Sequence, residues 1–464
     1  MTGPPYACLF YVKAEAQPWR PEGLFVRPSS SPSLSADSSP RINVYTSDMV
    51  TASRWLLTRD FCFLWWSQVL SQVAEGVSKL ALLWFVYAVT GSPIKTTGIG
   101  LLLTLPPILL GPVIGVAVDR FPKKAILIGS DLARGVLIGV IPCLVSVEHF
   151  TVESLYLLTF LYGTATALFV PTLSSVVPCM VSRPQFTAAN AWLQSTTSIG
   201  IILGPAASGL GIAFSGSQDV LCVNAVTYFA SAACLWPIRL EEAGGASEAD
   251  RGNERFFASL LYGLRWALFG QHTMLALIVL ASIYTFGSGA FTTLFPVFGR
   301  HLLGLGPVEI GYLWSWLGAG LLLASFGLVR VSAWELPGRL SIITVTSAFA
   351  GGALVALTST QNVYAASLLV ACIGFGFGTW TPIAWGLIQD VAPPGMVGRV
   401  MAVYTAVATA TSMLGMGVFG WIAEWFGSIS SVIGIGLVML LLAGGTVWFR
   451  GQVGGAGFRK KPPE

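Results

Sequence analysis

Between two long apolar segments, residues 115–124 read GVAVDRFPKK. The acid Asp119 and the bases Arg120, Lys123 and Lys124 are crowded into the second half of this run. Basic residues gather in short loops on the cytoplasmic side of a membrane, while the flanking apolar segments cross the lipid. The run therefore predicts a hairpin loop between two membrane-spanning helices, and it predicts on which side of the membrane the loop lies.

The composition also indicates a membrane protein. Of the 464 residues, 54% are hydrophobic and 10% are charged, and the mean hydropathy is +0.73. Soluble domains carry about 25% charged residues, so a water-soluble fold could hardly hide this much apolar surface and the lipid bilayer is the expected surrounding. The net charge of +4 reflects basic loops. No Lys/Arg-dense helix or zinc-ligand spacing supports a nucleic-acid partner.

Reactive side chains are sparse. The seven cysteines show no C-x-x-C spacing and most lie in apolar runs, so we interpret them as small buried hydrophobic residues. The histidines His149, His272 and His301 fall near segment ends, which argues against a histidine proton relay or a metal cluster. No Walker A or kinase motif appears. We expect no enzyme activity, no catalytic residue, no metal and no cofactor.

Apolar segments recur from residue 60 onward. We count about twelve, each near the roughly 20 residues that a crossing needs, and one long polar break at 239–265 divides them into two sets. The predicted fold is an all-α membrane protein of about twelve transmembrane helices in two six-helix bundles. The expected spans are residues 60–89, 97–118, 124–146, 153–171, 187–213, 220–238, 273–298, 309–330, 340–359, 363–388, 400–423 and 428–449.

The expected domains follow from this division. Residues 1–53 include a Ser/Pro-rich stretch and predict a disordered cytoplasmic extension. Because Met49 directly precedes a typical lead into a first helix, a start assigned too far upstream is a second interpretation. The remaining parts are an N-terminal bundle at 54–240, a cytoplasmic linker at 241–268 with an amphipathic helix, a C-terminal bundle at 269–450 and a cytoplasmic tail at 451–464.

The distribution of Lys and Arg predicts the orientation. With the N-terminus inside, the outer loops carry only Lys95 and Arg300, while the inner loops and tails carry the many other loop bases. We therefore expect a multi-pass protein of the plasma or inner cell membrane with both termini in the cytoplasm.

A polar stripe runs along the first expected helix. Its members are spaced four, three and four residues apart, which places them on one face of a helix; they are Gln68, Gln72, Glu75 and Lys79. Charges at hydrocarbon depth should face a cavity or partner helices rather than lipid. One interpretation makes Glu75 the proton-coupling site of an exporter. The other is a structural ion pair with Lys79, whose charge favours the ionised carboxylate.

Two six-helix sets with a charged central loop resemble the major facilitator superfamily. The loop resembles the superfamily signature G-x-x-x-D-R-x-x-[RK]-[RK] at Gly115, Asp119, Arg120, Lys123 and Lys124, with Pro122 where Gly is usual. We interpret these residues as a charge lock that favours one gate state, with Gly115 permitting close helix approach. The alternative is a plain hairpin loop.

Two further motifs belong to the same interpretation. Asp131 and Arg134 lie one to two turns past the loop and are expected to brace the gate. The fifth span resembles the G-x-x-x-G-P-x-x-G-G signature of drug/proton antiporters, with Ser208 replacing one Gly. The expected packing residues are Gly200, Gly204, Pro205 and Gly209, and the cavity residues on the same helix are Asn190 and Gln194.

The order of such motifs over residues 54–450 resembles the enterobactin-exporter and macrolide-efflux branch. That resemblance implies a secondary exporter of amphipathic small molecules, of the drug, macrolide or siderophore class, driven by proton antiport. We also expect the protein to be a monomer. A lysophospholipid-type transporter of the same fold is one alternative, because Lys79 suits an anionic headgroup. A transport-inactive sensor or scaffold is another, and the intact loop and buried charges argue against it.

Overall fold

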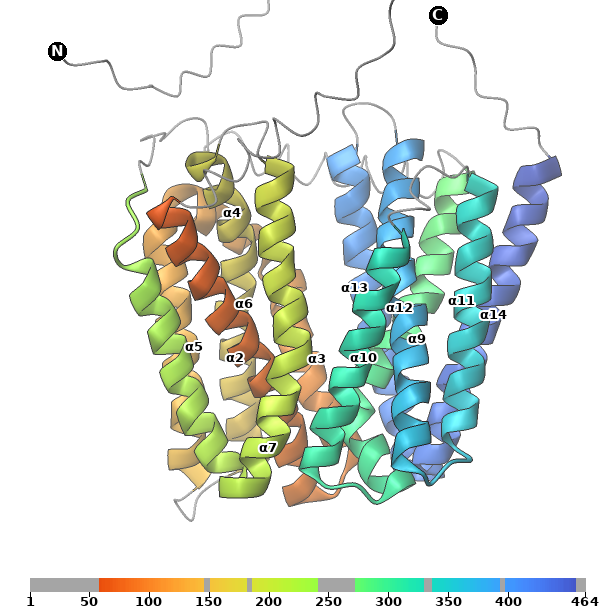
Figure 1. Ribbon diagram of the computed structural model, residues 1–464, viewed down its shortest axis with the longest axis horizontal. Coiled ribbons are helices and arrows are strands. Elements are labelled where there is room, and N and C mark those ends of the chain that lie inside the picture. The colour runs from red at the N-terminus through yellow and green to blue at the C-terminus, as the bar shows by residue number, and fades with distance from the viewer. Residues whose placement is uncertain are drawn as a thin grey trace, which may run out of the picture.

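The computed structural model of the chain describes residues 58–145, 151–181, 186–240, 272–328, 336–392 and 397–455. The regular elements in these ranges are α-helices, which form two groups that lie side by side (Figure 1). The N-terminal group contains α2 (Arg59–Thr90), α3 (Pro93–Leu109), α4 (Gly111–Arg120), α5 (Lys123–Val145), α6 (Val152–Met180) and α7 (Phe186–Leu235). The C-terminal group contains α9 (His272–Leu303), α10 (Pro307–Leu328), α11 (Leu336–Leu357), α12 (Val363–Val391), α13 (Val397–Phe426) and α14 (Ser428–Gly455). The expected N-terminal extension and linker lie outside the described residues.

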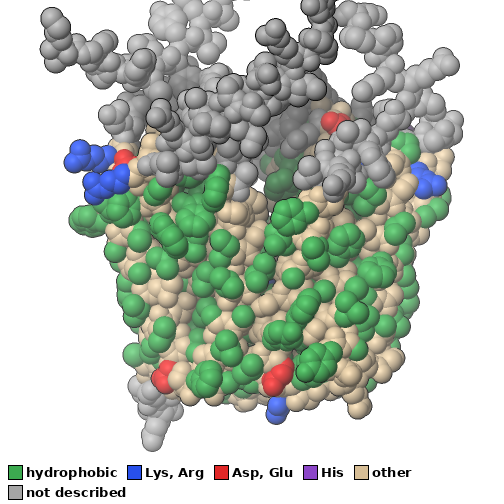
Figure 2. Space-filling model, in the orientation of Figure 1, with side chains coloured by type: hydrophobic (Ala, Val, Ile, Leu, Met, Phe, Trp, Pro, Cys, Tyr) green, Lys and Arg blue, Asp and Glu red, His purple; other side chains and the backbone are tan. Residues whose placement is uncertain are grey.

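The helices carry the surface expected of a multi-pass membrane protein. Ten of those that the structure describes are long and apolar enough to cross a membrane, and α3 is a shorter apolar helix. Large apolar side chains such as Leu157, Val223 and Val345 are exposed. Hydrophobic side chains cover the flank of the molecule, while charged ones appear at its two ends (Figure 2). The prediction of an all-α membrane fold is confirmed at this level.

The expected span 97–118 is divided into two helices. The backbone leaves helical geometry at Leu110, between α3 and α4. Pro106, Pro107 and Pro112 surround this point. Proline lacks an N–H and its ring clashes with the preceding turn, so this density of prolines interrupts the hydrogen bonds of a continuous helix.

Helix α7 holds two of the expected spans, 187–213 and 220–238. The two parts meet at Gly216, whose φ of 88° and ψ of 164° are not helical. A positive φ is readily adopted by glycine and is costly for residues with a Cβ atom. Gly216 is therefore the point at which one helical rod ends and the next begins.

The two groups converge at one end of the molecule. We call the end where α2 begins at Arg59 the terminal face, and the end where α2 finishes at Thr90 the far face. In Figure 1 the groups approach each other toward the far face and diverge toward the terminal face. A Cβ added at Gly311 of α10 would lie 2.4 Å from the carbonyl oxygen of Pro205 on α7. Glycine thus permits backbone contact between the groups there.

Candidate functional site

The polar stripe of α2 lies partly inside the protein. Gln68 is buried, and Gln72, Glu75 and Lys79 are half-buried. The Oε1 atom of Gln68 has no hydrogen-bond partner among the described residues. A buried polar atom without a partner is costly, so this end of the stripe can accept a hydrogen bond from water or a bound molecule.

Glu75 and Lys79 do not pair with each other. Among the described residues, the Glu75 carboxylate forms neither an ion pair nor a hydrogen bond. The Lys79 ammonium instead lies 5.7 Å from the centroid of the Trp314 ring on α10. Trp314 is held by Phe295, with ring centroids 5.1 Å apart. The interpretation of a close ion pair is therefore wrong in this conformation, because an aromatic face of the other group lies within reach of the ammonium.

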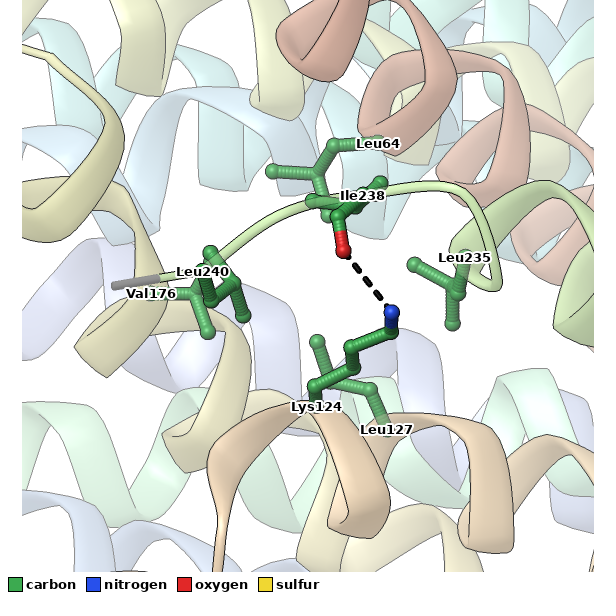
Figure 3. A pocket seen from close by; sticks show the side chains of 7 residues that line it. All are labelled: Leu64, Lys124, Leu127, Val176, Leu235, Ile238 and Leu240. Carbon is green, nitrogen blue, oxygen red and sulfur yellow. Dashed lines mark hydrogen bonds between the residues drawn. The ribbon is translucent and has the colours of Figure 1, made fainter. Parts of the chain in front are cut away.

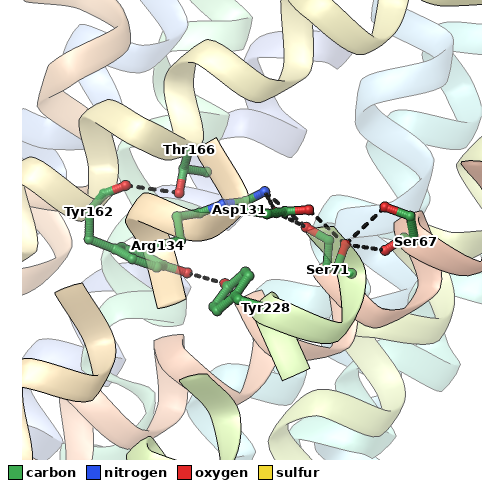
Figure 4. Close-up of polar contacts among 8 residues, drawn as sticks. Ser67, Ser71, Asp131, Arg134, Tyr162, Thr166 and Tyr228 are labelled. Atoms are coloured by element: carbon green, nitrogen blue, oxygen red, sulfur yellow. Dashed lines mark hydrogen bonds and ion pairs between the residues drawn. The ribbon is translucent and has the colours of Figure 1, made fainter. Parts of the chain in front are cut away.

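A second set of charges is fully buried inside the N-terminal group. Asp131 and Arg134 form a short ion pair and are 0% and 1% exposed. Ser231 of α7 donates to Asp131 over 2.7 Å. The Arg134 Nη2 atom donates to Ser71 of α2 over 3.0 Å (Figure 4). A buried ion pair is tolerated when further hydrogen bonds satisfy its atoms.

Aromatic rings pack against the buried Arg134 guanidinium. The Arg134 guanidinium carbon lies 4.5 Å from the ring centroid of Phe169 and 4.9 Å from that of Tyr228. The hydroxyls of Tyr228 and Tyr162 are 2.6 Å apart (Figure 4). The network joins α2, α5, α6 and α7 of one group. Asp131 and Arg134 thus brace helices within the N-terminal group, and their contacts do not reach the other group.

Lys124 of the charged loop has a specific role at the end of α7. Its ammonium donates to the carbonyl oxygen of Trp236 over 2.6 Å. It also donates to that of Ile238 over 2.8 Å (Figure 3). These carbonyls follow the last residue of α7, where a cation is favoured by the helix dipole. The lining of the small apolar pocket around it comprises Leu64, Lys124, Leu127, Val176, Leu235, Ile238 and Leu240.

The other loop residues lie at the terminal face. Arg120 is exposed and Lys123 is half-buried, while the side chain of Asp119 lies outside the described part. A Cβ added at Gly115 would meet nothing within 4 Å. The close helix approach expected at Gly115 is therefore not made in this conformation, because no other helix reaches it.

The glycines of α7 make two successive close crossings. A Cβ at Gly200 would lie 2.5 Å from the Gln72 carbonyl oxygen, and one at Gly204 would lie 2.7 Å from the Gly76 Cα atom on α2. A Cβ at Gly209 would lie 2.4 Å from the Pro307 carbonyl oxygen on α10. The same helix therefore contacts its own group and, further along, the other group. Pro205 lies between these crossings, and the cavity candidates Asn190 and Gln194 are exposed nearer the terminal face.

The C-terminal group offers aromatic rather than charged interior surface. Tyr284 of α9 stacks on Trp380 of α12 with centroids 5.3 Å apart. The glycine run of α12 is used for packing, since a Cβ at Gly374 would lie 2.1 Å from the Leu317 carbonyl oxygen. Trp380 is buried and Tyr284 is half-buried, so these aromatic rings pack inside the group.

Three residues that join the groups were not identified from the sequence. They are Trp314 over Lys79, His301 beside Tyr87, and Glu424 beside Ser92. His301 and Glu424 stand near segment ends, where polar residues are common, and their partners are 214 and 332 positions away. No local pattern reveals such contacts.

Long apolar helices in two groups, with charges held between and within them, define a multi-pass membrane transporter. The family model described as Major Facilitator Superfamily matches residues 64–416, and the chain belongs to this superfamily. Its members are transporters rather than enzymes.

Efflux proteins are among its relatives. The chain is 26% identical to the multidrug efflux pump Tap of Mycolicibacterium fortuitum, over 79% of this chain and 90% of that protein. It is 24% identical to macrolide efflux protein A of Streptococcus pyogenes, over 78% of this chain and 89% of that protein. These similarities agree with the efflux branch that the motifs indicated.

The fold is also similar to solved transporters. A bacterial homologue of the human lysosomal transporter Spinster, in an inward-facing and unoccupied conformation, superposes with a TM-score of 0.69 at 14% identity. The match covers 87% of this chain and 98% of that one. The nucleoside transporter NupG gives a TM-score of 0.63 at 14% identity, over 86% and 99% of the chains. At this identity the likeness concerns the fold alone.

Proposed function

We propose that this protein is a proton-driven secondary exporter of amphipathic small molecules. The observation that carries the proposal is the Glu75 carboxylate, which lies midway along α2 and has no ion-pair partner among the described residues. An interior acid of this kind is costly unless it serves a function. The similarity to drug and macrolide efflux proteins supports an export role.

The architecture proposed is two bundles of six crossings. In the N-terminal bundle, α3 and α4 form one crossing and α7 forms two, while α2, α5 and α6 form one each. In the C-terminal bundle, α9 to α14 form one crossing each. Such bundles transport by rocking about a site near the middle of the membrane.

The orientation proposed places the terminal face in the cytoplasm of the cell. The bases Arg120, Lys123 and Lys124 lie at this face, as the positive-inside rule requires. The groups contact at the far face and diverge at the terminal face. The structure then corresponds to an inward-facing state, the state named in the description of the Spinster homologue.

In the proposed transport cycle, the Glu75 carboxylate binds either a cationic substrate or a proton, but not both at once. The ionised carboxylate attracts a cationic or hydrogen-bonding drug from the cytoplasmic side. A proton entering from outside neutralises the carboxylate and releases the drug. Lys79, held over Trp314, forms no ion pair with the acid in this state. Gln68, Gln72, Asn190 and Gln194 would supply the polar wall.

The charged loop would act as the cytoplasmic gate. Gly115 has open space around it in this state, which leaves room for the loop to close against the other bundle. Asp119 and Arg120 would make the closing contacts, while Lys124 stays anchored to α7. Closure there would accompany opening of the far face.

The experiment uses inverted membrane vesicles and a lipophilic fluorescent dye. An imposed proton gradient should drive dye uptake, and an uncoupler should abolish it. Glu75→Gln should remove gradient-driven uptake while the protein remains folded. Asp219→Asn, which alters an exposed acid of α7, is the matched control and should behave as wild type. Full gradient-driven uptake by Glu75→Gln would contradict the proposal.

A lysophospholipid-type transporter is the second candidate. It is favoured by Lys79, whose ammonium has an aromatic partner but, among the described residues, no acid within ion-pair distance. An unpaired cation suits an anionic headgroup. Spin-labelled lysophospholipid moving across proteoliposomes without a proton gradient, and stopped by Lys79→Gln, would favour this function over drug export.

A further inference from the structure

Among the described residues, two polar contacts close to the helix ends join the groups at the far face, and neither belongs to the stripe of α2. A further contact between the groups, from the Ser315 hydroxyl of α10 to the Ile202 carbonyl oxygen of α7, lies further along these helices. In the first, Glu424 near the end of α13 accepts a hydrogen bond from the Ser92 hydroxyl over 2.7 Å. The same carboxylate accepts from the Ile94 backbone N–H over 3.2 Å. In the second, the Tyr87 hydroxyl contacts His301 Nε2, and His301 Nδ1 lies 3.0 Å from the Ser428 hydroxyl.

We infer that Glu424 is a second proton-binding group of the transport cycle, and that its protonation from the far side releases the far-face contact between the groups. This inference rests on the proposed proton-driven cycle. It adds a carboxyl in the C-terminal group that takes up the proton before Glu75 does.

The position of Glu424 suits this role. Its side chain is exposed at the far face, so protons reach it directly. Its hydrogen bonds go to Ser92, the N-cap of α3, and to the first turn of that helix. A carboxylate at a helix N-terminus is favoured by unpaired backbone N–H groups and by the helix dipole. The ionised acid therefore holds α3 of one group against α13 of the other.

The surrounding charges leave Glu424 without a salt bridge. Lys95 of α3 and Arg300 of α9 are the described cations near this corner, and Glu153 of α6, Asp219 of α7 and Glu309 of α10 are the other described acids of the far face. No described residue forms an ion pair with Glu424. Its hold on α3 thus depends on hydrogen bonds that lose strength when the carboxyl becomes neutral.

The groups that donate hydrogen bonds to Glu424 determine whether its protonation strengthens or weakens the far-face contact. Ser92 and the Ile94 N–H both donate to Oε2 of Glu424. A proton on the carboxyl removes the negative charge that α3 favours and weakens both bonds. Protonated His301, in contrast, donates from both ring nitrogens to hydroxyl oxygens of Tyr87 and Ser428, so its contact persists. Acid on the far side therefore weakens the Glu424 contact and favours an opened far face.

The Glu424 contact links the pH outside the cell to the transport cycle in one direction. In an exporter driven by inward proton flow, the state open to the outside is the one that must take up protons. A gate that opens when its own acid is protonated couples the outside pH to that state. The proton then reaches Glu75 through an opened far face.

The test measures the distance across the far face by electron spin resonance. Labels are placed at the exposed positions Ser215 of α7 and Gln361 before α12, in the full chain with native cysteines replaced, in lipid nanodiscs. In the unsubstituted background, lowering the pH from about 7 to about 4, through the range in which glutamate carboxyls take up protons, should increase the population of widely separated labels several-fold. In Glu424→Gln, the population of widely separated labels should be large at every pH.

The matched control is Glu309→Gln. Glu309 also accepts from a backbone N–H, that of Gly306, but within its own group, so this variant should keep the wild-type response. His301→Asn should lower the fraction of molecules whose far face is closed at the higher pH. That fraction should still fall when the pH is lowered. A wild-type pH response in Glu424→Gln, or a response lost only in His301→Asn, would overturn the inference. Because no substrate is present, gradient-driven dye uptake tests the proposed function separately.

Discussion

The Lys79 ammonium on α2 lies 5.7 Å from the centroid of the Trp314 ring on α10, so the two groups meet through a cation and an aromatic face. Glu75 stands one turn away on the same helix as Lys79 and is left without an ion-pair partner among the described residues. The ammonium one turn from this acid thus faces an aromatic ring of the opposite group.

Replacement of Trp314 should redirect Lys79. In Trp314→Leu the ammonium loses a contact worth about 0.5–2 kcal/mol, and pairing with Glu75 becomes its best alternative. Gradient-driven dye uptake should fall several-fold. Adding Lys79→Met to Trp314→Leu should restore part of the uptake, because the competing cation is gone.

Trp316→Leu serves as the control, since Trp316 lies on the same helix and packs against Tyr312. It should leave uptake near the wild-type rate. Equal losses in the two tryptophan variants would show that the effect is one of general packing.

The Asp131 and Arg134 pair should be important for stability. Asp131→Asn leaves a buried guanidinium without its counter-ion, which costs about 3–5 kcal/mol. The midpoint of thermal unfolding in detergent should fall markedly. Combining Asp131→Leu with Arg134→Met should recover much of the loss, because a buried pair replaced by apolar groups is often neutral.

A surface pair provides the comparison. Arg339 and Asp390 are 2.8 Å apart, but the Asp390 side chain is 64% exposed. Asp390→Asn should change stability by about 0–1 kcal/mol. If Asp131→Asn were equally mild, the buried network would not brace the N-terminal group.

Bulk at Gly311 should separate the groups at the far face. In Gly311→Ala the new Cβ would lie 2.4 Å from the Pro205 carbonyl oxygen and 3.1 Å from the Gly209 Cα atom. Forced overpacking costs about 1–3 kcal/mol, which disfavours the far-closed state and should slow export. Gly352→Ala has open space at its Cβ and should export at the wild-type rate. Cysteine accessibility from the far side, higher in Gly311→Ala alone, checks the cause.

Loss of the Lys124 ammonium should loosen the end of α7. Hydrogen bonds to charged groups are worth about 1.5–3 kcal/mol, and Lys124→Met removes two of them. Limited proteolysis just after residue 240 should become faster. Lys123→Met is the control, because Lys123 makes no hydrogen bond to a described residue. Equal cleavage rates in both variants would argue against the anchoring role.

The positions of the helices were largely predictable. The expected span 60–89 is observed as Arg59–Thr90, and 363–388 as Val363–Val391. Hydrophobicity and helical periodicity are properties of residues that are neighbours in the chain, so a single sequence is enough to predict where the helices lie. The interruption at Leu110 was missed because the span was assigned from its apolar composition, which does not show where a helix is broken.

The site was predictable only as a set of candidates. The stripe spacing of α2 placed Gln72, Glu75 and Lys79 on one face, and all three are half-buried in the structure. Their partners could not be read from the spacing. Glu75 and Lys79 were within pairing range on the helix, yet Trp314 decided where the ammonium lies.

By itself, the sequence determined that this is a multi-pass helical membrane protein, that its family signature lies at 115–124, and that an acid stands midway along the first helix. These follow from local composition and spacing. Only the tertiary structure decided that Lys124 anchors α7 and that Glu424 holds Ser92 across 332 positions. Such contacts depend on how the helices cross, and crossing is set by close packing at glycines such as Gly209 and Gly311.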